Sequence, residues 1–394
     1  MAAHRAGDRV LCMSRTYNVP LRYILGPLRE RIDVRLMLWE EAPAQDWESL
    51  PARSRGHDGD VERAYAHEIH IGRPNDEREY PRTVTFVSPR MLWDLLRAPE
   101  RVVLTRELNL ATLYAVMSKV RRGRRVVAMV EGDFTLLGTT GSASYKVALR
   151  RLVARFVDAF VANSASATEY LTDVLNVPRR RIVEGWWLAG MPREAGDEPA
   201  QPTQPVGRPP VVLAGGQLIP RKGFDLLIDG IARYRRDVGP CRLLLVGDGP
   251  ERAALQAQVE RLGLDDVDFL GVVPHEQMDK LMRSCDLFAF PTLFDLVGRV
   301  SVEALSVGTP VAASTLSGAS GVLVRDGVNG VLMDPRDPAS VTNALRRGLD
   351  PAINAQLREG ARATSAHITP EVAAQHILTA VWRAGGRPRA GASR

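Results

Sequence analysis

The residues best suited to chemistry lie in the segment PTLFDLVGRVSVEALSVGTPVAAS, residues 291–314. Asp295 follows a short apolar run that is typical of a strand, and Glu303 lies on the helix expected after it. Gly298 stands between the two carboxylates, where the backbone can approach a ligand closely, and free N–H groups at a helix start attract phosphate. The segment indicates a place to hold an anionic, hydroxyl-rich molecule. An ordinary strand–helix–strand unit with acids facing water would show the same pattern.

Two more loops carry suitable groups. In GGQLIPRKG, residues 215–223, paired glycines permit a tight turn, and Arg221 and Lys222 supply positive charge. The other loop, VGDGPER at 246–252, is a glycine turn that opens a helix but lacks the third glycine of the dinucleotide fingerprint. A basic surface loop and a plain strand-to-helix turn are the alternatives for these two segments.

The elements that position these loops follow from the hydrophobic pattern. Short apolar, β-branched runs alternate with longer helical patterns, which predicts an α/β fold with parallel sheets, and such sheets bind ligands at the carboxyl ends of their strands. The predicted strands are Val10–Ser14, Val34–Trp39, Thr83–Ser88, Val102–Thr105, Val126–Gly132, Phe160–Ser164 and Ile182–Trp187, followed by VVLAGG, RLLLVGDG, VDFLG, LFAFPT, PVAAS and GVLM.

A proline-rich stretch at 192–210 divides the chain into two predicted domains, 1–191 and 211–366, and we expect a last helix at about 367–390 to pack back on the first. Residues 43–80 are polar and predict a long loop with a little helix. The pair His67 and His70 lies there without the third ligand that catalytic zinc needs. No metal site is predicted.

Composition excludes several classes of protein. The 394 residues carry a formal charge of +6, but acidic residues are scattered among the basic ones, which disfavours nucleic acid as a partner. The densest basic run, KVRRGRR at 119–125, should end a helix. Cys12, Cys241 and Cys285 are expected to be buried, reduced thiols. Without an apolar run long enough to span a bilayer or a secretory start, a cytoplasmic location is expected.

The helix predicted at 145–157, YKVALRRLVARFV, has one apolar and one basic face. Such a helix can lie on an anionic lipid surface, which makes a peripheral membrane contact one interpretation of the pattern. A packed helix of an α/β layer has the same pattern and is the interpretation that we favour.

Taken together, the spaced elements GG-x-L-x-P-x-KG, VGDGPER, FLG-x-V, FP and D-x7-E followed by GTPVAAS resemble the second half of the family 4 type retaining glycosyltransferases. The resemblance is dense from Val211 to Leu345 and weaker in VANSASATEYLTDVLNVPRRRIV, residues 161–183. It implies the GT-B fold, two Rossmann-like domains whose parallel sheets face each other across a cleft. It also implies transfer of a sugar from a UDP- or GDP-linked donor to a hydroxyl acceptor, without a metal or other cofactor.

The resemblance assigns roles to individual residues. Lys222 matches the lysine that contacts the donor diphosphate, and Glu303 the glutamate that accepts hydrogen bonds from the ribose. Gly298 matches the helix start beneath the donor. The donor-binding residues implied are Gly216, Gln217, Arg221, Lys222, Gly271, Val272, Asp295, Gly298, Arg299 and Glu303.

The sequence departs from the family pattern at positions that affect the mechanism. Asp295 stands where a glutamate usually holds hydroxyls of the donor sugar, and Gln217 where an arginine often shares the phosphate charge. Glu131 stands where many members of the family have a histidine. Its carboxylate can accept a hydrogen bond from a sugar hydroxyl or offset the positive charge of an oxocarbenium ion. We take Glu131, Lys222 and Asp295 as the catalytic candidates. A nucleotide-sugar epimerase, a phosphorylase of the same fold, or a binder without activity are the rival functions.

Arg299 follows Gly298 at a position usually held by an apolar residue, and we predict that it faces the diphosphate or the sugar of the donor. Arg299→Ala should then raise the KM for the donor or lower kcat, because a cation that offsets the donor charge is lost. Steady-state kinetics with varied donor concentration checks this, and unchanged kinetics would reject the role.

Overall fold

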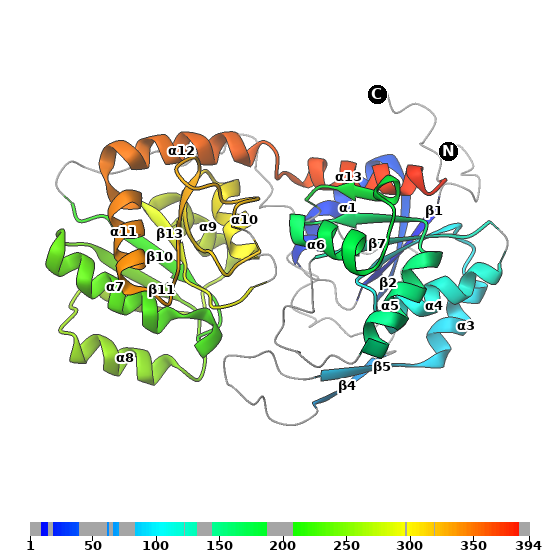
Figure 1. Cartoon of the computed structure of the whole chain (residues 1–394), viewed down its shortest axis with the longest axis horizontal. Coiled ribbons are helices and arrows are strands. Elements are labelled where there is room, and N and C mark those ends of the chain that lie inside the picture. The colour runs from blue at the N-terminus through cyan, green and yellow to red at the C-terminus, as the bar shows by residue number, and fades with distance from the viewer. Residues whose placement is uncertain are drawn as a thin grey trace. The chain divides into compact units, whose positions relative to one another are not determined.

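The computed structural model describes residues 9–14, 19–38, 61–62, 66–70, 83–121, 123–131, 144–186, 208–295, 298–318 and 320–385. The chain divides into two compact units, each described here by itself (Figure 1). The first unit contains Met1–Pro74, Pro81–Ala189 and Pro370–Arg394, and the second contains Gly190–Thr369. Much of the predicted linker, 192–207, lies outside the described residues.

The first unit is built on a parallel sheet of seven strands in the order β3-β2-β1-β6-β7-β8-β9. Its central strands are largely apolar, and their apolar side chains are buried, as in parallel strands covered by helices. The strands are β1 (Arg9–Ser14), β2 (Asp33–Leu38), β3 (Val61–Glu62), β6 (Val102–Arg106), β7 (Arg125–Val130), β8 (Ala159–Ala162) and β9 (Ile182–Glu184).

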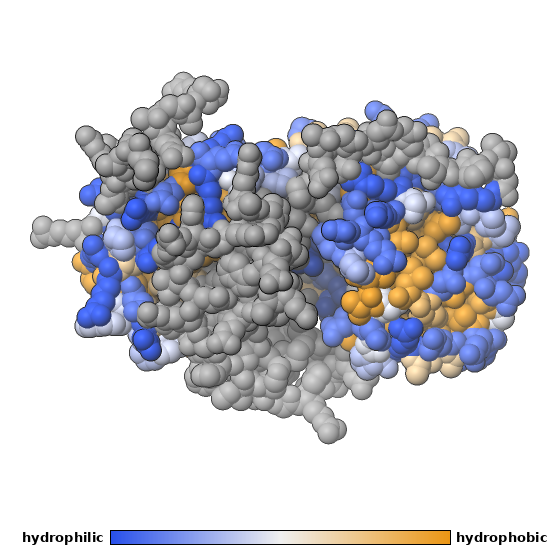
Figure 2. Space-filling model, turned by 180° about the vertical axis from the view of Figure 1, so that it is seen from behind, coloured by the Kyte–Doolittle hydropathy of each residue, from blue (hydrophilic) through white to orange (hydrophobic). Residues whose placement is uncertain are grey.

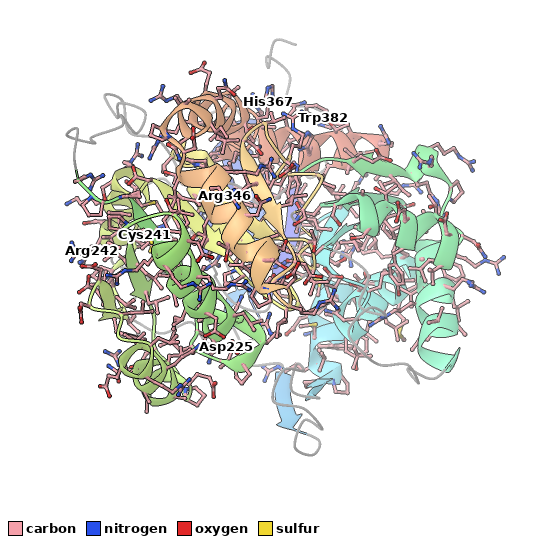
Figure 3. The ribbon with its side chains drawn as sticks, turned by 60° about the vertical axis from the view of Figure 1, so that its left-hand side comes forward. Asp225, Cys241, Arg242, Arg346, His367 and Trp382 are labelled. Carbon is pink, nitrogen blue, oxygen red and sulfur yellow. The ribbon has the colours of Figure 1, made fainter. Side chains whose placement is uncertain are left out.

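Helices pack around this sheet, among them the last helix of the chain. They are α1 (Val19–Arg31), α3 (Pro89–Arg97), α4 (Leu110–Met117), α5 (Ser144–Phe156), α6 (Ala165–Glu169) and α13 (Pro370–Arg383), with short turns η1 (Ser118–Val120), η3 (Tyr170–Val174) and η4 (Arg179–Arg181). Helix α13 packs on α1, β8 and β9, and its His376 Nδ1 lies 2.9 Å from the carbonyl oxygen of Trp186. Trp382 of the same helix is labelled in Figure 3.

Residues 66–87 differ from prediction. The expected loop with a little helix contains β4 (Ala66–His70), which pairs antiparallel with β5 (Thr83–Val87). The run predicted at Thr83–Ser88 is therefore a strand, but it lies outside the parallel sheet. The sequence TVTFV alternates polar and apolar residues, a pattern typical of an antiparallel strand with one solvated face.

The second unit is built on a parallel sheet of six strands in the order β12-β11-β10-β13-β14-β15. All six strands coincide with the predicted runs, because each is short, apolar and bounded by glycine or proline. They are β10 (Val211–Gly215), β11 (Arg242–Val246), β12 (Val267–Gly271), β13 (Leu287–Phe290), β14 (Val311–Ser314) and β15 (Gly330–Met333).

Helices also cover the second sheet. They are α7 (Phe224–Asp237), α8 (Arg252–Arg261), α9 (His275–Ser284), α10 (Arg299–Ser306), α11 (Pro338–Leu349) and α12 (Pro351–Ser365), with a short turn η5 (Pro220–Lys222). Cys241, labelled in Figure 3 beside Arg242 at the start of β11, is a buried free thiol, as are Cys12 and Cys285, which confirms that prediction. On the face shown in Figure 2, apolar side chains of this unit lie open between hydrophilic ones.

Strand order fixes where each unit can bind a ligand. In the second sheet the order reverses between β10 and β13, and in the first between β1 and β6. Open parallel sheets bind ligands outside the carboxyl ends of their strands at such a switch point, because the adjoining loops leave in opposite directions. The loop after β10 carries Lys222, and the loop after β13 carries Asp295. The loop after β6 begins with Glu107.

None of the helices in the described ranges combines the length and the hydropathy needed to cross a membrane.

A substitution at Gly247 tests how closely its backbone approaches that of Gly216 in the second unit. Its φ is 124°, and an added Cβ would overlap the carbonyl oxygen of Gly216. We expect Gly247→Ala to lower the free energy of unfolding by about 3 kcal/mol, since backbone strain and overlap add. Gly263→Ala is the control: its φ is also positive, at 61°, but a Cβ there meets open space, so a loss of about 1 kcal/mol is expected. Calorimetry that found equal losses would contradict the close approach.

Candidate functional site

An ion pair between Lys222 and Asp295 lies at the switch point of the second sheet. Lys222 Nζ donates to Asp295 Oδ2 at 2.7 Å, and Arg221 Nη1 lies 3.5 Å from the same oxygen. The N–H of Gly298 donates to Asp295 Oδ1 at 2.9 Å. Both carboxylate oxygens therefore bind groups of the protein itself.

Backbone hydrogen bonds hold the two loops together around this pair. The N–H of Leu293 donates to the carbonyl oxygen of Arg221 at 2.8 Å, and the N–H of Gly318 donates to that of Asp295 at 2.9 Å. Arg221 is buried, with 7 % of its surface exposed, and donates to the carbonyl oxygen of Phe294. The loop after β13 is thus tied to the turn that carries Lys222.

The surroundings of Asp295 keep it ionised. Burial alone would raise the pKa of Asp295, but Lys222, the N–H of Gly298 and Arg221 outweigh burial and hold that pKa below its ordinary value. The ammonium group of Lys222 also lies 5.3 Å from the centre of the Phe290 ring, within the range of a cation–π interaction.

Glu303 is buried on α10 and paired with Arg299. Arg299 Nε lies 3.2 Å from Glu303 Oε1, and the Arg299 side chain is 46 % exposed. Burial raises the pKa of Glu303 above its ordinary value, although Arg299 and His275 act in the opposite direction. Arg299, predicted to face the diphosphate or sugar, thus contacts the carboxylate predicted to bind the ribose.

The glycine loops of this unit converge at the same sheet edge. The N–H of Gly247 donates to the carbonyl oxygen of Gly271 at 2.7 Å, and that of Gly216 to Val246 at 2.9 Å. Gln217 is exposed, and Val272 is 80 % exposed. All ten residues predicted to bind the donor therefore come from the loops that follow β10, β12 and β13, from the last residue of β12, or from α10.

Gly298 shows why this edge needs a glycine. Its φ is 69°, and a Cβ would overlap the Phe290 ring. A glycine lets the backbone turn from Asp295 into α10 while Phe290 stays beneath Lys222.

Glu131, the remaining predicted site residue, belongs to the first unit. It follows β7, and Arg106 Nη2 donates to its Oε1 at 2.5 Å. Ser164 Oγ donates to the Glu131 carbonyl oxygen at 3.1 Å.

Glu107 is a second carboxylate beside Glu131 that sequence reasoning missed. Its Oε1 accepts the N–H of Glu131 at 2.8 Å, and its φ of 59° is left-handed, which is rare for this residue type. Burial, followed by the charge of Glu131, raises the pKa of Glu107 to about 8 against the opposing effects of the Glu131 N–H, Arg106 and Arg150. The available signal was an acid directly after a predicted strand at a sheet edge.

Within the described ranges, no group of three or more His, Cys, Asp or Glu side chains is placed to hold a metal ion.

Comparison with known proteins accounts for this arrangement. The model of the family "Glycosyl transferases group 1" matches residues 197–364. Residues 197–364 are a group 1 glycosyltransferase domain. This group 1 domain contains Lys222, Asp295, Arg299 and Glu303, which agrees with the resemblance found in the sequence.

Curated relatives match part of the chain. The D-inositol 3-phosphate glycosyltransferase of Nocardia farcinica is 31 % identical over 229 residues, which are 55 % of this chain and 49 % of the relative. The GDP-mannose-dependent α-(1-6)-phosphatidylinositol monomannoside mannosyltransferase of Mycolicibacterium smegmatis is 34 % identical over 148 residues, 36 % of this chain and 38 % of the relative. The chain thus matches about half or less of the length of these relatives.

Solved structures match nearly the whole chain. Anabaena HepE in complex with UDP is 22 % identical, with a TM-score of 0.71 over 95 % of this chain and 99 % of its own. The lipopolysaccharide outer core galactosyltransferase WaaB is 14 % identical, with a TM-score of 0.69 over the same shares of both chains. The predicted GT-B class, two α/β units built on parallel sheets, is confirmed.

Glu107 gives a prediction that does not depend on function. Its pKa rises from 4.5 to about 8 on folding, so between these values the folded protein binds more protons than the unfolded chain, and stability falls as pH rises. Glu107→Gln has no proton to lose and keeps an acceptor for the Glu131 N–H. The difference in Tm between the variant and the wild type should therefore shift in favour of the variant as the pH rises from 5 to 8.

Tryptophan fluorescence suits this measurement, because all six tryptophans belong to the first unit. Glu169→Gln, a change at an exposed glutamate of α6, is the control and should run parallel to the wild type. Parallel curves for Glu107→Gln as well would show that Glu107 ionises normally.

Proposed function

We propose that the protein is a retaining glycosyltransferase that takes a sugar from a nucleotide-diphosphate sugar and joins it to a hydroxyl group of an acceptor. The observation that carries this proposal is the position of Lys222: a cation at the switch point of a group 1 domain, beside the start of α10. A cation beside a helix N-terminus there suits a diphosphate.

In the proposed reaction, the bond between the anomeric carbon and the diphosphate oxygen breaks, and the nucleoside diphosphate leaves with the electron pair. The acceptor oxygen forms the new bond on the same face, and its proton passes to the departing phosphate. Lys222 stabilises the leaving group as negative charge grows on it. Glu303 accepts hydrogen bonds from the ribose, and no metal ion is needed.

The proposed donor base comes from the comparisons with known proteins, and the proposed acceptor comes from the family resemblance. Anabaena HepE was solved with UDP, and the M. smegmatis relative is named as GDP-mannose-dependent, so the proposal covers both UDP- and GDP-linked donors. The acceptor is a hydroxyl-bearing small molecule, glycan or lipid-linked sugar. Glu131, held by Arg106 in the first unit, is the residue we propose to contact the reacting sugar.

A peripheral membrane contact through residues 145–157 remains part of this proposal. Helix α5 exposes about half of Leu149, Leu152 and Phe156, and Arg151 and Arg155 are exposed on the same helix. Exposed apolar side chains beside bases favour an anionic lipid surface.

Nucleotide binding tests the proposed function. UDP or GDP, with EDTA present, should raise the Tm of the wild type, and Lys222→Met should raise the Kd of that nucleotide about tenfold, since a charge-assisted contact is worth about 1.5 kcal/mol or more. Lys280→Met, at an exposed lysine of α9, should bind as the wild type does. Binding that strictly required a divalent metal, or that ignored Lys222, would contradict the proposed mechanism.

A further inference from the structure

We propose that Asp295 is a positioning residue: it holds the ammonium group of Lys222 and the start of α10 in place for the donor diphosphate, and it does not bind the donor sugar. This inference rests on the proposed function and changes the role that the resemblance implied for Asp295.

The first step concerns what Asp295 already binds. Its Oδ2 accepts a hydrogen bond from Lys222 Nζ at 2.7 Å and lies 3.5 Å from Arg221 Nη1. Its Oδ1 accepts a hydrogen bond from the N–H of Gly298 at 2.9 Å. The side chain is 17 % exposed. A sugar hydroxyl would have to compete with two cations and a backbone N–H at this carboxylate.

The second step concerns how far Asp295 can move. Its carbonyl oxygen accepts the N–H of Gly318 at 2.9 Å, and Asp295 forms a parallel bridge with Ser317. These contacts fix the backbone of Asp295, and from this backbone the short aspartate side chain reaches the ammonium group of Lys222.

The third step concerns Lys222, which keeps donors for a ligand. An ammonium group has three N–H donors. One donates to Asp295, and the Phe290 ring lies 5.3 Å away on another side. A phosphate oxygen can therefore join the pair without displacing Asp295, and because the lysine is already held, it loses little side-chain entropy when the ligand binds.

The fourth step concerns Arg221, which serves Asp295 and not the ligand. Arg221 is buried and donates to the carbonyl oxygen of Phe294, next to Asp295 in the chain. It therefore fixes Asp295 from the protein side. Arg221 thus fixes Asp295, and Asp295 in turn fixes Lys222 and the N–H of Gly298.

The test compares a nucleoside diphosphate with its sugar form. We expect Asp295→Asn to raise the Kd of UDP, or of GDP if that is the nucleotide bound, about tenfold and to raise the Kd of the corresponding nucleotide sugar by the same factor. In a Lys222→Met background the same change should have less than a twofold effect, since the group that Asp295 positions is gone. Weaker binding of the nucleotide sugar alone would overturn the inference and restore the sugar-holding role.

Asp326→Asn is the matched control. Asp326 also accepts one backbone N–H, from Leu332 at 2.8 Å, and pairs with one cation, Arg347, at 2.9 Å, but it has no contact with Lys222 among the described interactions. Its variant should bind nucleotides as the wild type does. A tenfold loss there as well would mean that Asp295→Asn acts through general instability.

A measurement without ligand separates this inference from the proposed function. Competitive acetylation of the full chain should label Lys222 several-fold faster in Asp295→Asn than in the wild type, relative to the exposed Lys280. Unchanged labelling of Lys222 would overturn the hold of Asp295 on Lys222. A wild type that binds no nucleotide but shows the labelling change would instead reject the proposed function.

Discussion

The ion pair between Lys222 and Asp295 is the interaction on which the second unit's binding edge depends. A buried pair loses the hydration of both ions, and it is favourable only when further hydrogen bonds and charges compensate. Here Arg221 and the N–H of Gly298 supply that compensation. Because Lys222 follows β10 and Asp295 follows β13, the pair joins the two loops that leave the sheet at its switch point.

The two units solve the same electrostatic problem differently. Each places a carboxylate at the switch point of its parallel sheet, Asp295 in one and Glu107 in the other. Asp295 has two cations beside it and stays ionised, whereas Glu107 shares Arg106 with a second carboxylate, Glu131, and keeps its proton to about pH 8. Burial raises the pKa of both acids, and the neighbouring cations outweigh burial at Asp295 but not at Glu107.

The sequence predicted the second sheet well, since buried parallel strands read as continuous apolar runs. It did not predict that Arg221 would be buried or that Glu107 would adopt a left-handed backbone, because the partners of both lie far away in the chain. The basic run at 119–125 shows the same limit. Arg124 in that run is buried and donates to the carbonyl oxygens of Leu95, Ala98 and Glu100, so it closes the end of α3 in place of facing solvent.

Charge balance connects the ion pair to turnover in the proposed reaction. Lys222, Arg221 and ionised Asp295 together carry one positive charge, so Asp295 lowers the charge that the diphosphate meets. In the proposed reaction the orientation of Lys222 outweighs this lost charge. An ammonium group that Asp295 already holds in place needs no reorganisation as negative charge grows on the leaving group, and such preorganised charges stabilise a transition state more than mobile ones do.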